Sequence, residues 1–361
     1  MIEDISRRAF LGGMGSVPAV TVAQGNPISL TVSILQEAKD RAKPEFANVY
    51  LGSPSDGLHY LSAFGARHLF PSIYEDLHLR CLRSAKAACW ALAENGDGIA
   101  IVDCQTFLDA VEVGQPLVSV AQLSTGWPYR VVLPPESTVT HLRGLHRAQI
   151  LVNGWTERRA AERLIKLNVL HGSTVLNVRD TVVDDLNDGY GTAALISEIE
   201  KADLEFAAPS FRYLAADLLA KRPRSCVVAH FAALNDRDFA AALKRFLLTL
   251  NAAVAFIREA PDAALEVIAA QPDCQNLRCN KRALASAIRD ELTTGWQTMG
   301  VSLRFGRHKA NDWKNWLNCE PSTNEAALSR FRSGKLFTDA HLSMGDRGLT
   351  RFARLSYAVR G

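Results

Sequence analysis

The residues of this chain that are able to do chemistry lie in a few polar stretches, each of which follows a short apolar, β-rich run. They carry hydroxyl, amide, carboxylate, imidazole and indole groups, or are a glycine that lets a backbone approach. The residues that we single out are Ser53, Ser55, Asp103, Gln105, Thr106, Gln122, Ser124, Thr125, Trp127, Gly154, Trp155, Thr156 and His230. Such groups exchange hydrogen bonds with a small molecule, and an indole adds an apolar wall with one N–H donor.

Motifs for covalent or metal chemistry are missing from the sequence. There is no Gly-x-Ser-x-Gly elbow, no P-loop and no His-Glu-x-x-His. Cys104 is a conceivable nucleophile, but no base is recognisable beside it. The seven cysteines fit no zinc spacing and read mostly as buried core thiols, although Cys274 and Cys279 are close enough in sequence for a local disulfide. We expect no catalytic residue, no metal and no cofactor.

Strand-like runs alternate with helical patterns from residue 45 onward. Examples are the strands GIAIVD (98–103) and RAQILVN (147–153), followed by helices. The strongest helix is predicted over 236–260, with Asn235 as its cap, and Pro261 starts the next one. Regular alternation of this kind predicts an α/β fold with parallel or mixed sheets covered on both faces.

Composition excludes some classes of partner. The net charge is +3, and no basic-aromatic run occurs, so we expect no nucleic acid partner. Apolar runs downstream of the first residues are too short to span a membrane.

The first residues have the pattern of an export signal. The hexad SRRAFL (6–11) matches the twin-arginine signal pattern, and the uncharged, small and apolar stretch 9–23 follows it. Ala19 or Ala23 offers a cleavage position. We therefore predict a signal over 1–25, export by the twin-arginine machinery and a soluble periplasmic product.

The order of the segments resembles the periplasmic substrate-binding proteins of ABC importers, in the nitrate, sulfonate, taurine and thiamine-precursor branch. The matching phrases are ALAENGDGIAIVD, DAVEVGQPLVSV, LRGLHRAQILV, DDLNDGYGTAAL and RFLLTLNAAVAFIREAPDAALEVIA. They run in the family's order over about residues 45–340. Two departures stand out: 190–193 holds no acid where the family has one, and the segment before the first strand is longer than usual.

The resemblance implies a two-lobe, type II periplasmic binding protein fold, with doubly wound mixed sheets joined by a two-crossover hinge. The implied bounds are a linker over 26–44, lobe one over 45–130 and 225–361 with the C-terminal tail, and lobe two over 131–224, with hinges near 129–133 and 221–227. Ligand would lie between the lobes, at the carboxyl ends of strands, where helix N-termini attract anions.

Each predicted contact has a plainer alternative. Ser53, Ser55 and Asp103 are equally placed to cap the helices that follow them, and Trp155 with Thr156 reads also as a surface indole beside an ordinary cap. The family's second-lobe anion site falls in this last loop, after the strand 147–153. His230 is included because it ends the strand CVVAH.

The resemblance implies capture of a small, sulfonate- or nitrate-like anion and its delivery to an ABC permease in the inner membrane. An aromatic or thiamine-precursor solute is the alternative ligand, because tryptophans lie in two of the predicted loops. An enzyme or a sensor domain on the same fold is the alternative function.

Overall fold

The computed structural model describes residues 48–52, 60–69, 71, 74, 77–126, 129–214, 222–270, 285, 288, 306–319 and 325–342. The predicted export signal, the linker and the pair Cys274 and Cys279 lie outside these residues. In the described part, no helix has the length and apolar character needed to cross a membrane.

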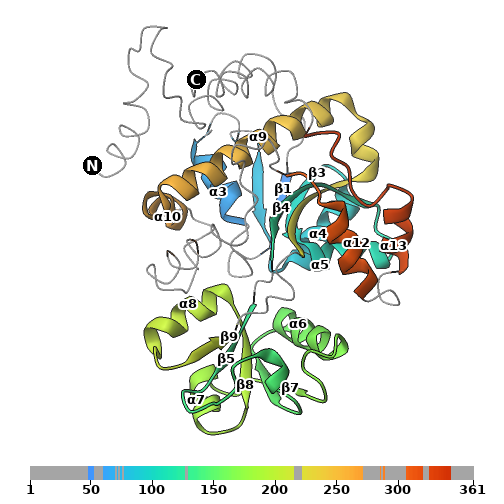
Figure 1. The fold of residues 1–361 in the computed structure, drawn as a ribbon. Helices are drawn as coiled ribbons and strands as arrows, with labels where there is room; N and C mark the ends of the chain where they lie inside the picture. Colours follow the sequence, from blue (N-terminus) through green and yellow to red (C-terminus); the bar gives the residue numbers. More distant parts are fainter. Residues whose placement is uncertain are drawn as a thin grey trace, which may run out of the picture.

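The described strands form two five-stranded sheets (Figure 1). In order across each sheet, the first contains β2 (His78–Cys81), β1 (Asn48–Leu51), β3 (Gly98–Asp103), β10 (Pro223–His230) and β4 (Leu117–Thr125), and the second contains β7 (Thr174–Asn177), β6 (Gln149–Val152), β8 (Ala193–Ser197), β5 (Tyr129–Leu133) and β9 (Arg212–Leu214). One strand runs against its parallel neighbours within each sheet: β10 is antiparallel to β3 and β4, and β5 is antiparallel to β8 and β9. The chain passes from the first sheet to the second after β4 and returns before β10, which gives the predicted two crossovers. We call the body around the first sheet lobe one and the body around the second sheet lobe two.

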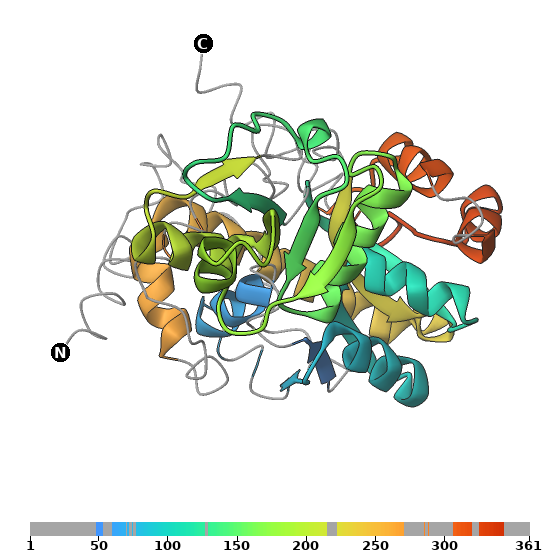
Figure 2. The ribbon, with the colours of Figure 1, turned by 90° about the horizontal axis from the view of Figure 1, so that it is seen from below.

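Helices cover both faces of each sheet, as the alternation of segments predicts. Lobe one carries α3 (Leu61–Leu69), α4 (Ala85–Asn95), α5 (Cys104–Glu112), α9 (Arg237–Glu259), α10 (Pro261–Ala269), α12 (Ala310–Cys319) and α13 (Glu325–Arg332), and lobe two carries α6 (Trp155–Lys166), α7 (Val182–Asn187) and α8 (Glu198–Ala207). In Figure 1, α9 lies across lobe one on the side away from lobe two. The view in Figure 2 is from the side of lobe two.

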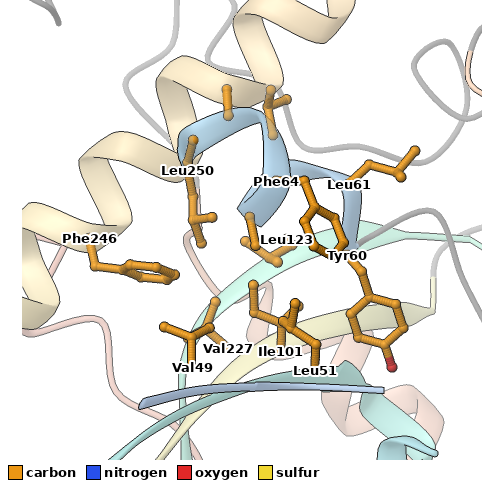
Figure 3. Close-up of a cluster of buried hydrophobic side chains, with 14 of the residues drawn as sticks. Val49, Leu51, Tyr60, Leu61, Phe64, Ile101, Leu123, Val227, Phe246 and Leu250 are labelled. Carbon is orange, nitrogen blue, oxygen red and sulfur yellow. The ribbon is translucent and has the colours of Figure 1, made fainter. Parts of the chain in front are cut away.

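The largest core lies between α3, α9 and one face of the first sheet. In Figure 3, Phe64 and Phe246 point from these helices toward Val49 and Ile101 of the strands, and all four side chains are buried. The other face of the same sheet packs against α4, α5, α12 and α13, with Trp313 at its centre. Burial of such large apolar side chains is the main stabilising contribution to the lobe.

The helix predicted over 236–260 is confirmed as α9, with one correction. Its cap is Asp236 rather than Asn235, because the Asp236 carboxylate accepts hydrogen bonds from the backbone N–H groups of Asp238 and Phe239. Asn235 ends a short 3₁₀ turn that precedes the helix. A carboxylate at this position also interacts favourably with the positive end of the helix dipole.

The buried-thiol prediction is confirmed for Cys89, Cys104 and Cys226. They are free, have no exposed surface and lie in the core that α4 and α5 form with the first sheet. Burial raises the pKa of the Cys104 thiol well above its ordinary value, and the neighbouring thiol of Cys226 acts in the same direction. A thiol in this setting is a poor nucleophile.

Candidate functional site

The carboxyl ends of the parallel strands of both sheets adjoin the crossover between the lobes. β4 ends at Thr125, and β5 starts at Tyr129, which pairs with the last residue of β8, Ser197. Four residue steps span at most about 14 Å, so these two strand edges lie near each other. The returning chain runs alongside, since the Gly126 N–H donates to the carbonyl of Arg222 at 2.8 Å. Open α/β sheets bind ligands at such edges.

On the lobe-one side, Asp103 ends β3 and caps α5. Its carboxylate accepts from the backbone N–H of Thr106 at 2.8 Å and from the Thr106 hydroxyl at 2.6 Å. Burial raises the pKa of the Asp103 carboxyl, while the two hydrogen bonds from Thr106 act against the rise. The N-terminus of α5 therefore already holds a carboxylate, and Asp103 acts as a helix cap, which was the alternative to ligand contact.

The three predicted contacts in β4 differ in exposure. Gln122 and Ser124 have no exposed surface, whereas Thr125, at the end of the strand, is partly exposed. The side-chain oxygen of Gln122 accepts from the indole N–H of Trp313 at 2.9 Å, and the Ser124 hydroxyl shares a hydrogen bond with that of Ser225. The structure thus places the first two side chains inside lobe one.

On the lobe-two side, the N-terminus of α6 differs from the helix starts around it. The Gly154 N-cap makes no side-chain cap hydrogen bond, whereas α5 is capped by Asp103 and α8 by a reciprocal pair of Ser197 and Glu200. An uncapped helix start offers backbone N–H groups and a partial positive charge to an anion. The prediction that Thr156 caps this helix is wrong, because the helix starts at Trp155 and Gly154 is the cap.

A carboxylate of the first turn lies close to this uncapped start. A Cβ atom built on Gly154 would be 2.6 Å from Oε2 of Glu157. The side chain of Glu157 therefore points back along the helix toward its N-cap. Any anion at this helix start would lie beside that charge.

Polar pairs that sequence reasoning missed line the same edge of lobe two. Arg130 forms a 2.9 Å ion pair with Glu198, and the Asn153 amide donates to Glu200 at 3.0 Å. The capping box of α8 was readable in the sequence as Ser197 followed three residues later by Glu200. The ion pair was not readable, because its members are far apart in the chain.

Gln105 contacts lobe two rather than open solvent. Its amide nitrogen donates to Asp109 at 2.7 Å, and its oxygen accepts from the guanidinium of Arg163 in α6. Arg163 was not among the predicted residues.

The structure separates His230 from the other predicted residues. β10 runs antiparallel to β3, so its carboxyl end lies beside Leu117, the first residue of β4, at the opposite edge of the sheet. The imidazole Nδ1 accepts from the Ala232 N–H at 3.2 Å and caps a 3₁₀ turn. The direction of this strand depends on its pairing with β3 and β4, which its own residues do not reveal. Ser53, Ser55 and Trp127, and the side chains of Trp155 and Thr156, lie outside the described residues.

A Ser-His-Asp chain lies elsewhere in lobe one. The Ser119 hydroxyl is 2.7 Å from His308 Nε2, and His308 Nδ1 is 2.6 Å from the Asp339 carboxylate. Ser119 has no exposed surface, and its backbone binds residues 336 and 338. A nucleophile must be reachable by its substrate. The chain instead fastens the C-terminal segment to the edge strand β4.

Metal ligands do not gather in the described part of the chain, where no group of three or more His, Cys, Asp or Glu side chains is placed to hold an ion.

Comparisons with known proteins identify the fold. No family model matches the chain, and no curated protein matches it in sequence. The solved structures that it resembles include the periplasmic aliphatic sulphonate-binding protein of Escherichia coli, with a TM-score of 0.59 and 13% identity over 79% of this chain and 89% of that one. A Candida albicans protein described as having the generic periplasmic binding protein fold gives a TM-score of 0.52 and 14% identity over 81% and 96%. The alkanesulfonate-binding protein of Xanthomonas axonopodis pv. citri bound to MOPS gives 0.51 and 13% over 84% and 98%.

At these identities the likeness establishes the fold. The chain has the two-lobe periplasmic binding protein architecture, with mixed α/β sheets and two crossovers, as predicted.

Proposed function

We propose that this protein is an extracytoplasmic solute-binding protein that captures a small anion between its lobes and delivers it to an ABC permease. The observation that carries the proposal is the N-terminus of α6, which lies at the carboxyl edge of the lobe-two sheet and has no side-chain cap. The helix starts that follow β3 and β8 are occupied by their own caps. The N-cap of α6 has no side chain, so an anion at this helix start would meet backbone N–H groups, with the Glu157 carboxylate as its neighbour.

The fold supports a binding role without specifying the ligand. Two of the similar structures are described as sulfonate-binding proteins, and one of them holds MOPS, which carries a sulfonate group. A sulfonate presents three acceptor oxygens and one negative charge, which suits a set of backbone N–H donors. We propose a sulfonate- or nitrate-like anion as the ligand class on this basis.

The export signal and the permease belong to the same proposal. The hexad SRRAFL and the uncharged stretch after it support export by the twin-arginine machinery to the periplasm. A two-lobe binding protein in that compartment would present its solute to a permease of the inner membrane. No catalytic step is part of the proposal.

The first experiment is a thermal unfolding screen of the purified full chain. The panel contains MOPS, taurine, alkanesulfonates, nitrate, bicarbonate, aromatic acids and thiamine precursors, each over a range of concentrations. A ligand at 100 times its dissociation constant adds about 2.7 kcal/mol to the free energy of unfolding, which raises the melting temperature by roughly 2–4 °C for a chain of this size.

Each anion of the panel is compared with an uncharged analogue of the same shape, so that the screen tests for the charge. We expect a saturable shift for a sulfonate or another small anion and none for an uncharged sulfone or amide of the same shape. No shift with any member of the panel would contradict capture of such a solute. A shift with uncharged or cationic members alone would contradict the assignment to anions.

A further inference from the structure

Two helices from different lobes pair along their sides. Gln105 and Asp109 lie one turn apart on α5, and Arg159 and Arg163 lie one turn apart on α6. Arg163 donates to Gln105, and Arg159 lies 4.0 Å from Asp109. The order of these partners is reversed along the two helices, so α5 and α6 lie antiparallel. We call these four residues the α5–α6 latch.

The latch forms a connected network. The amide of Gln105 donates to Asp109 at 2.7 Å while its oxygen accepts from Arg163. The carboxylate of Asp109 is thereby shared between its own helix and Arg159 of the other lobe. Each lobe contributes two residues that are four positions apart on one helix, and two contacts join these residues across the lobes. Networks of this kind are held more strongly than isolated surface pairs.

The side chain of Arg163 is buried by its packing against lobe one. Only 7% of the residue is exposed, although it belongs to a lobe-two helix. Its guanidinium carbon lies 4.9 Å from the ring centroid of Trp316, a residue of α12 that packs in the lobe-one core. A desolvated arginine over an indole face gains a cation–π attraction. Because the arginine and its partners come from different lobes, separation of the lobes would break these contacts together.

The adjacent arginines of α6 do not share this arrangement. Arg158 donates to Asn177 at 2.8 Å, and both residues belong to lobe two. Arg159 is 44% exposed. Arg159 reaches Asp109 of lobe one from the surface, so among these arginines burial against lobe one is specific to Arg163.

We propose that the α5–α6 latch, with Trp316, holds the two lobes together in the ligand-free protein and so sets the affinity for the solute. The first part stands on the contacts alone, and the second part rests on the proposed function. A ligand that binds the closed form gains apparent affinity when that form is already populated. Helix α12 thereby contributes to closure through Trp316.

The test is small-angle X-ray scattering of the full chain without ligand, comparing wild type with Arg163→Ala. We expect the radius of gyration to rise in Arg163→Ala, because the lobes separate. Arg158→Ala is the matched control, since it removes an arginine from the same helix but breaks a contact within lobe two, and its radius of gyration should equal that of wild type. Equal values for Arg163→Ala and wild type would overturn the proposal.

A second variant tests the latch in case Arg163→Ala does not fold. Gln105→Ala removes the interlobe acceptor without leaving an arginine cavity, and it should raise the radius of gyration in the same direction. Circular dichroism shows whether each variant is folded. If Arg163→Ala is unfolded, Gln105→Ala decides, and an unchanged radius of gyration there counts against the latch.

Ligand binding by the same variants separates the two proposals. We expect Arg163→Ala to weaken the affinity for the anion found in the screen by about 5- to 150-fold, the range of typical coupling free energies. A larger radius of gyration in a chain that binds no solute would support the latch and contradict the proposed function. Unchanged scattering in a chain that binds solute would leave that function standing and refute the latch.

Discussion

The charge at the start of α6 provides the sharpest test of anion binding. The Glu157 carboxylate lies beside the Gly154 N-cap, where an anion bound to the N–H groups of this helix start would also lie. Like charges in such a place repel, so Glu157→Gln should strengthen anion binding. Gly154→Asp adds a second carboxylate and should weaken it. The backbone of Gly154 has φ −146°, which any residue adopts, and the atom nearest to a new Cβ is the flexible end of Glu157.

The magnitude follows from the separation of the charges. Two unit charges about 5 Å apart interact by roughly 0.8 kcal/mol at the dielectric constant of water and by roughly 3 kcal/mol at an effective value of 20. Each substitution should therefore change the dissociation constant by about 4- to 150-fold, in opposite directions.

Isothermal titration calorimetry with the anion from the screen measures both effects, at low and at high salt. Gly154→Asn is the matched control, because it supplies a neutral cap of the same shape and should change the affinity much less than aspartate. The reasoning is refuted if Glu157→Gln and Gly154→Asp shift the affinity in the same direction, or if the asparagine and aspartate variants bind equally well.

Three further predictions concern stability. Phe64→Ala should lower the free energy of unfolding by about 3–5 kcal/mol in urea titrations, because the side chain has no exposed surface, and a loss below 1 kcal/mol would contradict this placement. Trp313→Phe removes the indole donor to Gln122 and should cost about 1–3 kcal/mol in the same assay. Burial lowers the pKa of His308, against the opposing effect of Asp339, so protonation is harder in the folded than in the unfolded chain. Stability should fall as the pH drops below about 6.5, the ordinary histidine value. A His308→Asn variant should lose less over that range in thermal unfolding, and an equal loss would refute the assignment.

Local pattern was enough to predict the α/β class and the main helices and strands, whereas the two-lobe architecture was predicted from the resemblance to a known family. The alternation of strand and helix segments places β3, β6 and their following helices, because these elements depend on short apolar runs with clear breaks. The apolar stripe of α9 repeats at helical spacing, so its length was predictable to within one residue at each end. Its cap was misassigned because Asn235 and Asp236 are both good caps and only the backbone geometry distinguishes them.

The candidate site was predictable only in part. Asp103 and Gly154 follow strands whose ends are visible in the sequence, and the structure places both at the crossover edges. The same reasoning placed His230 at the wrong edge of the sheet, because the direction of β10 depends on its pairing with distant strands. Arg163 was missed for a related reason. On its own helix it reads as one of several surface arginines, and it becomes buried only when α12, more than a hundred residues later, packs against lobe one.

Helix α6 connects the two proposals made above. Its N-cap Gly154 and the buried Arg163 are nine residues apart, a rise of about 14 Å along a straight helix. A helix of this length moves as a rigid element, so an anion held at its start and the contacts of Arg163 act on the same body. A solute that also contacts lobe one would hold α6 in the position that the latch favours, and the two sets of contacts would stabilise the same closed arrangement. Since such coupling is reciprocal, loss of the latch should weaken the affinity for the solute, and bound solute should restore closure of the lobes in Arg163→Ala. Scattering of that variant at saturating solute should therefore return to the radius of gyration of solute-bound wild type, and a variant that binds solute yet stays extended would show that α6 does not couple the two sites.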